Sequence, residues 1–441
     1  MLLFCVSLVY HGLGLHTFSH WWFEDDANLY AYVRHFKNPL VFFWNRECLQ
    51  AFSGAMPLQL LTLWIDNTIA YRSILVAHLH QVASLTVTLI LIFYVLRGFG
   101  LSAWEALVLD LLWLCLPAVV AVNEFLSARF YMEGLAFGLA GILVAQKIGQ
   151  GSWRQGPGAT LLLFGTLMGA ALCKEFYSIT VPLFVFVYLY SCRKYSAAAI
   201  SLLVPPLYAI YRIWAVGWSM YWSVPFVGGR EYLQFLCRLP SISVGNEGGY
   251  LIVAALVLLC LRRFWEVNLW IAGCTLLLLG SALATIYPVT APLSRDWLVH
   301  GPWYRVMFLL STMILLGVGY WLWRTQKMST RAGVLFFAVL ILARGGYVTQ
   351  RHWHDSMARY KREGRYYLQH KDRLIYSELL GFWYLDGIQM LYEIVPRHHV
   401  TSQEGGPLSP EQAATYHTIW RYRDGIFVED RQLYEKLRGE R

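Results

Sequence analysis

Three adjacent carboxylates, Glu24-Asp25-Asp26, are the first residues of this 441-residue chain with an obvious capacity for chemistry. Three acids in a row repel one another, which raises at least one of their pKa values or draws in a cation or a basic partner. A carboxylate held directly after an apolar stretch suits a general base that acts on a hydroxyl or an amine. The structural alternative is a hydrated helix end, with the acids near a helix N-terminus.

Two further clusters combine acids with bases. Glu124, Arg129 and Tyr131 lie within eight positions of one another. They form either a local ion pair or a second acid with an anion contact that faces the first cluster. The dipeptide Lys174-Glu175 lies between two apolar runs with almost no loop. Because charges near a membrane interior are costly, this dipeptide is either a self-paired turn or a lysine that contacts a phosphate oxygen.

A fourth cluster is basic and aromatic. It contains Arg295, His300, Tyr304 and Arg305. The planar guanidinium group of arginine matches the oxygen atoms of a phosphate, so these residues suit a phosphate or diphosphate contact. The structural alternative is binding to lipid headgroups, to which any arginine at a membrane surface contributes.

The composition indicates a membrane protein. Apolar residues make up 57% of the chain and charged residues 14%, against roughly 25% charged residues in soluble proteins. These values exclude a disordered chain, a disulfide miniprotein and an ordinary cytosolic enzyme. Apolar runs fall at about 2–20, 74–96, 103–122, 131–146, 159–173, 178–192, 197–216, 249–261, 267–287, 303–323 and 332–349. We therefore predict an all-α polytopic membrane protein with about eleven transmembrane helices, within a range of ten to twelve.

Lysine and arginine set the predicted orientation. The loops after even-numbered runs are short and basic, with Glu266 as their single acid, whereas the loops after odd-numbered runs contain as many acids as bases or more. The positive-inside rule then predicts that the even loops and the N-terminus are cytoplasmic. The C-terminus is predicted to lie outside the cell, in the periplasm or an equivalent space.

Two units are predicted from this map. Residues 1–349 form a transmembrane domain whose first outer loop, 21–73, contains an amphipathic helix lying on the membrane within the stretch 30–46. Residues 350–441 are rich in both charge signs and form a small extracytoplasmic tail with a modest core of its own. Its segment 374–395 has apolar residues at helical spacing.

Several classes of site are absent from the sequence. There is no Gly-rich phosphate loop, no CxxC and no HExxH motif, and no nucleotide-binding domain is recognisable, which argues against an ATP-driven pump. The pairs His16/His20 and His78/His80 do not by themselves specify a zinc site. No metal ligand, cofactor or nucleic-acid partner is predicted, although a divalent cation at the acidic first cluster remains open.

The order of these motifs resembles that of a known superfamily. Glu24-Asp25-Asp26 follows the first run, and the stretch 56–72 begins Met-Pro-Leu and ends Tyr-Arg. Leu116-Pro117 precedes Glu124 and Ser127-Ala128-Arg129, and Lys174-Glu175 lies ahead of Pro182. In this order the motifs resemble the GT-C superfamily of membrane glycosyltransferases, which includes protein O-mannosyltransferases and bacterial lipid A aminoarabinose transferases. The motifs cover about residues 1–210, and the remainder is similar in architecture only.

The resemblance implies an inverting glycosyltransferase of the inner (plasma) membrane with its site on the extracytoplasmic side. It would move a sugar from a polyprenyl-phosphate-linked donor to a lipid, glycan or protein acceptor. The resemblance makes Asp25 or Asp26 the base, with Asp26 slightly favoured, and Glu124 the second acid. The donor phosphate would contact Lys174, Arg305, Arg295 and Arg129. Supporting positions would be Glu24, Tyr131, Glu175, Tyr304 and His300.

Other classes of function remain open. A transporter or flippase would use charged residues in or near the spans, such as Asp110, Glu105 and Arg212, but the sequence has no internal repeat. A polymerase of lipid-linked glycans should have an outer loop rich in Arg and His, and the loop 217–248 is poor in both. A purely structural subunit is the remaining alternative. The enzyme hypothesis requires that the four clusters line one cavity at the outer face.

Overall fold

The computed structural model describes residues 26–51, 55–71, 73–217, 308–325, 328–377, 383–394, 398–401, 408–423 and 426–439, with residues 3, 5–7, 22 and 237 as isolated positions. Within these ranges the chain is mostly helical. Three of the described helices are long and apolar enough to cross a membrane, or up to four if a bent pair counts as one span. The helical, membrane-type character predicted from the composition is therefore confirmed at this level, while the count of eleven spans stays a prediction.

The helices of the bundle coincide with the predicted apolar runs. They are α5 (Ile74–Gly98), α6 (Ala103–Leu114), α7 (Pro117–Glu124), α8 (Arg129–Gly149), α9 (Pro157–Cys173), α10 (Tyr177–Ser191), α11 (Tyr195–Ser201), α12 (Val204–Val216) and α18 (Phe308–Thr325). The predicted runs 249–261 and 267–287 lie outside the described residues, as does most of 2–20. The last predicted run, 332–349, forms part of α19 (Met328–Gln369).

The predicted span 103–122 is not one straight helix. A capping box at its start, in which Ser102 and Glu105 each bond the other's backbone N–H, fixes the beginning of α6. Pro117 then interrupts the run, because proline has no N–H and keeps Leu116 out of the helical region. Helices α6 and α7 consequently meet at an angle of 69°.

Glycines in α8 allow its neighbours to approach closely. A Cβ atom on Gly134 would lie 2.5 Å from the ring of Tyr177, and one on Gly141 would lie 2.9 Å from Leu167. Small residues at such crossings let helix backbones pack tightly where no water drives association. The close packing draws the break between α9 and α10 towards the first turn of α8.

The two ends of the bundle differ in charge. Near one end, Gln146 of α8 donates to the carbonyl of Val95 of α5 at 3.0 Å, and Gly149 lies against Tyr188 and Cys192 of α10. This end carries the basic loops that follow α5, α8 and α10. At the opposite end, the first turn of α8 contacts the first turn of α5, and the first loop, whose described residues carry acids and bases in equal number, packs there.

The described residues of the first loop, 21–73, form the short elements α2 (Asp26–Val33), the 3-10 helix η2 (Pro39–Phe43), α3 (Arg46–Ala51) and α4 (Pro57–Ile69). The predicted surface-lying helix over 30–46 is not what this region forms. Helix α2 is buried on nearly all sides, because α4 and the tail helix α20 (Trp383–Tyr392) cover it. In η2, the exposed side chains of Leu40 and Trp44 are the apolar groups available to a membrane surface.

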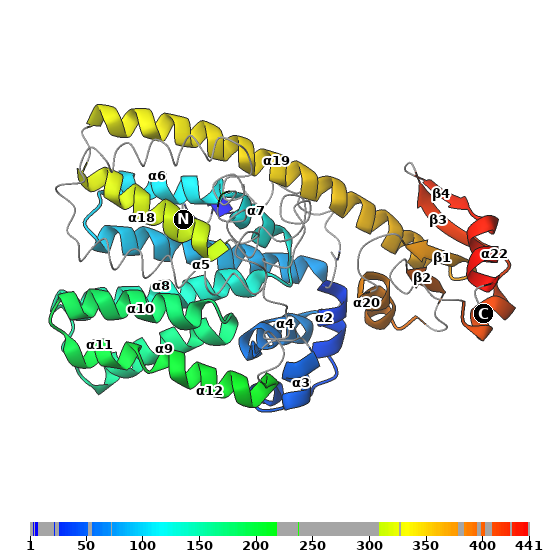
Figure 1. The fold of residues 1–441 in the computed structure, drawn as a ribbon, viewed down its shortest axis with the longest axis horizontal. Helices are drawn as coiled ribbons and strands as arrows, with labels where there is room; N and C mark the ends of the chain where they lie inside the picture. The colour runs from blue at the N-terminus through cyan, green and yellow to red at the C-terminus, as the bar shows by residue number, and fades with distance from the viewer. Residues whose placement is uncertain are drawn as a thin grey trace.

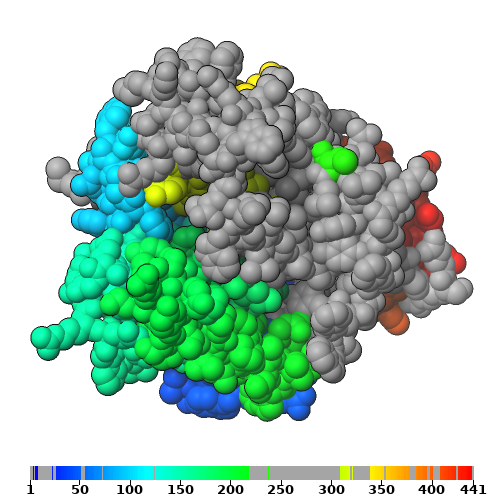
Figure 2. All heavy atoms as spheres, turned by 60° about the vertical axis from the view of Figure 1, so that its left-hand side comes forward, coloured from blue at the N-terminus to red at the C-terminus, as the bar shows by residue number. Residues whose placement is uncertain are grey.

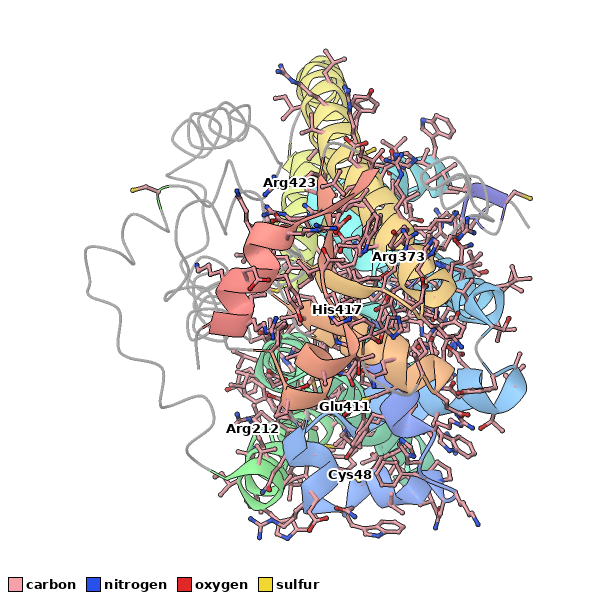
Figure 3. The ribbon with its side chains drawn as sticks, turned by 90° about the vertical axis from the view of Figure 1, so that its right-hand side faces the viewer. Cys48, Arg212, Arg373, Glu411, His417 and Arg423 are labelled. Carbon is pink, nitrogen blue, oxygen red and sulfur yellow. The ribbon has the colours of Figure 1, made fainter. Side chains whose placement is uncertain are left out.

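Helix α12 closes the lower edge of this end. Gln50 of α3 donates to the carbonyl of Ala215 at 3.3 Å, and the hydroxyl of Tyr211 donates to the carbonyl of Phe43 at 3.1 Å. Figure 2 shows the first-loop residues directly beneath α12. Viewed from the end of the bundle, Cys48 and Arg212 accordingly lie together at the bottom of the molecule (Figure 3).

The tail contains a sheet, which corrects the prediction of an all-α chain. Its strands are β1 (Leu374–Ser377), β2 (His399–Thr401), β3 (Ile419–Arg423) and β4 (Ile426–Glu429), in the order β2-β1-β3-β4. Strand β1 is parallel to β2 and β3, and β3 is antiparallel to β4. The described part of the segment 374–395 thus forms a strand followed by the helix α20. The strand was not predicted, because a four-residue apolar run is too short to distinguish a strand from a helix by its periodicity.

The sheet buries a different core on each face. Leu374, pointing to one face, packs with residues from α21 (Pro410–Thr415) and α22 (Arg431–Gly439) in a core that belongs to the tail alone. Ile375, pointing to the other face, belongs to the same core as the bundle. Helix α19 runs without a break through residue 350 and along the length of the bundle to the tail (Figure 1). The tail is thus continuous with the end that carries the first loop.

Candidate functional site

Asp26 is held at the start of α2 by a distant segment of the chain. Its Oδ1 atom accepts a hydrogen bond from the backbone N–H of Ser127 at 2.8 Å, and the residue is 1% exposed. The carbonyl of Ser127 in turn accepts from Nε2 of Gln59 at 3.1 Å. A carboxylate at a helix N-terminus is also stabilised by the helix dipole. The first and second sequence clusters therefore meet through Asp26.

A buried ion pair lies one turn further along the same elements. Nη2 of Arg129 donates to Oδ2 of Asp66 at 2.7 Å, and its Nε donates to Oε1 of Glu133 at 3.1 Å. Its Nη1 donates to the carbonyl of Ala77 at 3.1 Å. The side chain of Arg129 is 1% exposed. These contacts tie α4, α5 and α8 together at one point.

His80 bridges the two acids of this group. Its Nδ1 lies 2.6 Å from Oδ1 of Asp66, and its Nε2 lies 3.4 Å from Oε1 of Glu133. The imidazole ring thus lies between two carboxylates that also bond Arg129. We call Asp66, His80, Arg129 and Glu133 the charge network.

Tyr30 connects the charge network to α2. Its hydroxyl donates to Oδ2 of Asp66 at 2.6 Å, and burial raises the pKa of Tyr30 well above its ordinary value, so the phenol stays protonated. Burial alone would raise the pKa of Asp66. The hydrogen bond from His80 and the positive charge of Arg129 outweigh it, so the pKa of Asp66 is lowered. Asp66 is thus an anion at neutral pH, and its hydrogen bond with Tyr30 fixes α2.

Lys174 lies in the break between α9 and α10, among aromatic rings. Its Nζ atom is 5.2 Å from the ring centroid of Phe176 and 5.7 Å from that of Tyr131. The ammonium forms an ion pair with Glu175 at 3.1 Å and contacts Sδ of Met56 at 3.4 Å. The self-paired turn weighed from the sequence is therefore present. Ring faces attract a cation, so the ammonium is held in place from several sides.

The first turn of α4 joins the two halves of the site. Met56, the residue before α4, contacts Lys174, and Gln59 bonds the segment that holds Asp26. Pro57 at the first helical position fixes where this turn begins. An acid and a base from segments about 150 residues apart thus flank one helical turn. Such a pair can take a proton on one side and stabilise a developing anion on the other.

The structure brings part of the predicted set together. Asp26, Arg129, Tyr131, Lys174 and Glu175 lie at one end of the bundle. The backbone of Glu124 ends helix α7, three residues before Ser127. Six predicted residues lie outside the described ranges: Glu24, Asp25, Arg295, His300, Tyr304 and Arg305. A cavity lined by all of these residues stays a prediction.

The contacts of Arg129 indicate which role it has in the site. Each of its three kinds of nitrogen donates to a protein group, and the side chain is almost inaccessible. This arrangement favours a supporting role over direct contact with a phosphate. Tyr131 is similarly buried, with its ring against Phe130 and Phe176.

The charge network as a unit was not predicted from the sequence. Asp66 stands within an apolar helix of the first loop, and His80 follows 14 positions later at the start of a span. Isolated polar residues within apolar stretches were the available signal, since such residues need a buried partner. Their mutual pairing depends on how α4 folds back onto α5, which no local pattern specifies.

Two further features bear on the site: possible metal ligands and similarity to known proteins. Among the described residues, no group of three or more His, Cys, Asp or Glu side chains is placed to hold a metal ion. No family model matched the chain, and neither the curated proteins nor the solved structures gave a match. The geometry of the site therefore carries the functional argument.

Proposed function

We propose that this protein is a membrane glycosyltransferase of the GT-C type, which moves a sugar from a polyprenyl-phosphate-linked donor to an extracytoplasmic acceptor with inversion. Asp26 is the base in this proposal, with Asp25 beside it in sequence. The acceptor is a hydroxyl or amine of a lipid, glycan or protein.

The observation that carries the proposal is the placement of Asp26 and Lys174 about one turn of α4. Asp26 reaches that turn through Ser127 and Gln59, and Lys174 reaches it through Met56. Three segments that are far apart in the sequence supply these groups. Bringing a carboxylate and an ammonium to one end of an apolar bundle is costly, and such buried charges in membrane proteins commonly mark a substrate site.

The reaction can be written as one displacement. The carboxylate of Asp26 takes the proton from the acceptor O–H or N–H, and the acceptor atom forms a bond with the anomeric carbon of the sugar. The bond between that carbon and the phosphate oxygen breaks, and polyprenyl phosphate leaves with the electron pair. The hydrogen bond from Ser127 to Oδ1 orients the carboxylate towards this task.

Lys174 stabilises the negative charge of the leaving phosphate in this scheme. Its ammonium, held by Glu175 and the surrounding rings, would contact a phosphate oxygen as negative charge develops there. Arg305 and Arg295 are proposed as further donors to the phosphate, with His300 and Tyr304 in support. Arg129 acts indirectly, by holding α4, α5 and α8 in register beneath α2.

The proposal includes a topology. About eleven spans place the basic loops after α5, α8 and α10 in the cytoplasm and the site in the periplasm or an equivalent space. A cysteine-free variant carrying either Ser152→Cys, in the exposed loop between α8 and α9, or Glu411→Cys, exposed in the tail, tests this. An impermeant maleimide applied to intact cells should label position 411 and leave position 152 unlabelled; the reverse pattern contradicts the topology.

The reaction class is tested with purified protein in liposomes that contain polyprenyl-phosphate sugars extracted from the membranes of the source cells, together with an extract of candidate acceptors. We expect release of free polyprenyl phosphate that depends on both the protein and the acceptor extract. If the donor stays intact in every reaction, and a thermal melting curve shows that the protein is folded, the proposal is ruled out.

Asp110 favours a transporter as the second candidate. It is fully buried within α6, and neither carboxylate oxygen has a hydrogen-bond partner among the described residues. Buried acids within spans often belong to proton or ion pathways. Asp110→Asn should leave sugar transfer unchanged if the enzyme proposal is right. The transporter would instead be supported if the wild type shows no sugar transfer but moves a lipid-linked glycan across the liposome membrane, and Asp110→Asn loses that transport.

A further inference from the structure

Helix α20 of the tail packs directly on the backbone of α2, immediately after Asp26. A Cβ atom placed on Gly387 would lie 2.5 Å from the backbone nitrogen of Asn28, 3.0 Å from its Cα and 3.1 Å from the carbonyl carbon of Ala27. These atoms belong to the main chain, so they cannot rotate away as a side chain can. The absence of a side chain at position 387 is what allows the two helices to touch.

Three further contacts join the same two regions. The indole Nε1 of Trp22 donates to the hydroxyl of Tyr392 at 3.3 Å, and the hydroxyl of Tyr71 donates to the carbonyl of Leu391 at 2.8 Å. Arg34 forms an ion pair with Glu393. The C-terminal end of α20, residues 391–393, is thereby bonded to Trp22 before α2, to Arg34 just after α2 and to Tyr71 well beyond it.

A neighbouring face of α20 is anchored in the tail. Oδ1 of Asp386, the neighbour of Gly387, lies 2.9 Å from Nε2 of His399 in β2. Nδ1 of His399 lies 3.0 Å from the hydroxyl of Tyr367 in α19, and both residues are fully buried. The position of α20 is therefore set by the sheet and by the long helix α19, and Gly387 transmits it to α2.

Helix α2 is consequently held from two sides. The charge network fixes it from the bundle through Tyr30 and Asp66, and α20 presses on it from the tail (Figure 1). Residues on only one side would leave the helix able to tilt about that contact. A tilt displaces its first residue, Asp26, from the N–H of Ser127 and thus from the orientation that proton transfer requires.

We propose that Gly387 and Asp386 of the tail are positioning residues for the transfer reaction, which fix α2 and through it the Asp26 carboxylate. This inference rests on the proposed function. It gives the tail a role in catalysis without contact with substrate, and it separates that role from donor binding by Lys174, which is held by Glu175, by the rings of Tyr131 and Phe176 and by Met56 before α4.

The test compares Gly387→Ala with Gly439→Ala, in which the added methyl group meets nothing within 4 Å. Alanine is a better helix former than glycine, so a loss in Gly387→Ala cannot come from helix propensity. We expect kcat to fall roughly 10- to 100-fold with KM for the donor unchanged, as for a misplaced reacting group. Gly439→Ala should behave as wild type.

A second pair of variants adds no volume and guards against a misfolded Gly387→Ala. Asp386→Ala removes the acceptor for His399, whereas Asp386→Asn keeps a carbonyl oxygen in the same place. We expect kcat to fall in Asp386→Ala and to recover in Asp386→Asn. Equal kcat in all Gly387 and Asp386 variants, measured per folded molecule, would overturn the inference.

Hydrogen–deuterium exchange supplies a readout that does not depend on the reaction. Gly387→Ala and Asp386→Ala should speed exchange of the amides of residues 26–33 by about tenfold or more, while those of α8 and α9 stay protected. If α2 exchange is unchanged, the inference fails even if sugar transfer is established. If α2 exchange rises and the wild type transfers no sugar, the proposed function fails and the mechanical coupling stands.

Discussion

Two groups of charged residues lie at the same end of the bundle, and they are built differently. In the charge network, Arg129 donates to three partners and two acids share His80, so each member is bonded within the protein. Around the first turn of α4, Asp26 is instead held by a backbone N–H, and Lys174 by a sulfur atom, by aromatic rings and by its neighbour Glu175. Both groups are buried and both draw on separate segments, but the members of the charge network bond one another, whereas Asp26 and Lys174 reach the same turn of α4 through different residues.

The difference separates stability from chemistry. A buried charge that loses its partner destabilises a fold by several kcal/mol, so the charge network should govern whether the protein folds. In the proposed reaction Asp26 takes a proton and Lys174 contacts the donor phosphate, so these two residues should govern whether the protein acts. Substitutions in the two groups are therefore expected to give opposite patterns of stability and activity.

The largest expected effect on stability is that of Arg129→Ala. The substitution leaves Asp66 and Glu133 as buried anions that face each other, at a cost of about 3–5 kcal/mol. The thermal midpoint and the yield of monodisperse protein in detergent should both fall. The control is Arg154→Ala, at an exposed position between α8 and α9, which should leave both unchanged. An Arg129→Ala protein of normal midpoint would remove the distinction between the groups.

Lys174→Gln should show the opposite pattern. Loss of the ammonium weakens a charge-assisted contact with the donor phosphate, so KM for the donor should rise roughly 10- to 100-fold, with little change in thermal midpoint. Lys174→Arg should recover part of the loss because it keeps the charge. If Lys174→Gln unfolds the protein and its folded fraction keeps the wild-type KM, the ion pair with Glu175 is structural.

The stability contributed by Asp66 should depend on pH. Its folded-state pKa is lowered by His80 and Arg129, despite the opposing effect of burial. A lowered pKa contributes stability that is fully present above the unfolded value of about 4 and is lost as the pH falls through the folded value. The difference in thermal midpoint between wild type and Asp66→Asn should therefore shrink below about pH 4. A difference that stays constant from pH 7 to pH 3 would contradict this assignment.

The smallest effect is expected for the surface pair between Arg34 and Glu393, whose side chains are 42% and 58% exposed. Exposed ion pairs contribute about 0–1 kcal/mol and are screened by salt. Arg34→Ala should lower the thermal midpoint slightly at low salt and not at all at 1 M NaCl. A loss of more than about 2 kcal/mol would show that the junction of tail and first loop depends on charge more than on packing.

Much of the bundle could be predicted from the sequence because apolar length and proline positions are local signals. The runs at 74–96 and 131–146 correspond to α5 and α8, and Lys174-Glu175 forms the expected break. The approach of the first loop to the segment after α7 was one of two alternatives that the second cluster left open, and the bond from Ser127 to Asp26 agrees with it.

The remainder depends on long-range packing. The aromatic and basic composition of 30–46 suggested a surface helix, but α2 is buried because α20 from the far end of the chain covers it. The tail sheet was missed because its strands are only three to five residues long, and parallel strands pair across intervening helices. The partners of Asp66 come from three other elements, which no single stretch of sequence reveals.

The most direct test of the account compares sugar transfer by wild type and Asp26→Asn in liposomes with lipid-linked donor. The amide keeps an oxygen that can accept from Ser127 but cannot take a proton, so the account predicts a loss of kcat of about 1,000-fold or more with an unchanged thermal midpoint. Asp372→Asn, at a side chain 79% exposed, should match the wild type. Full activity in Asp26→Asn, at unaltered Asp25, would contradict the assignment of the base.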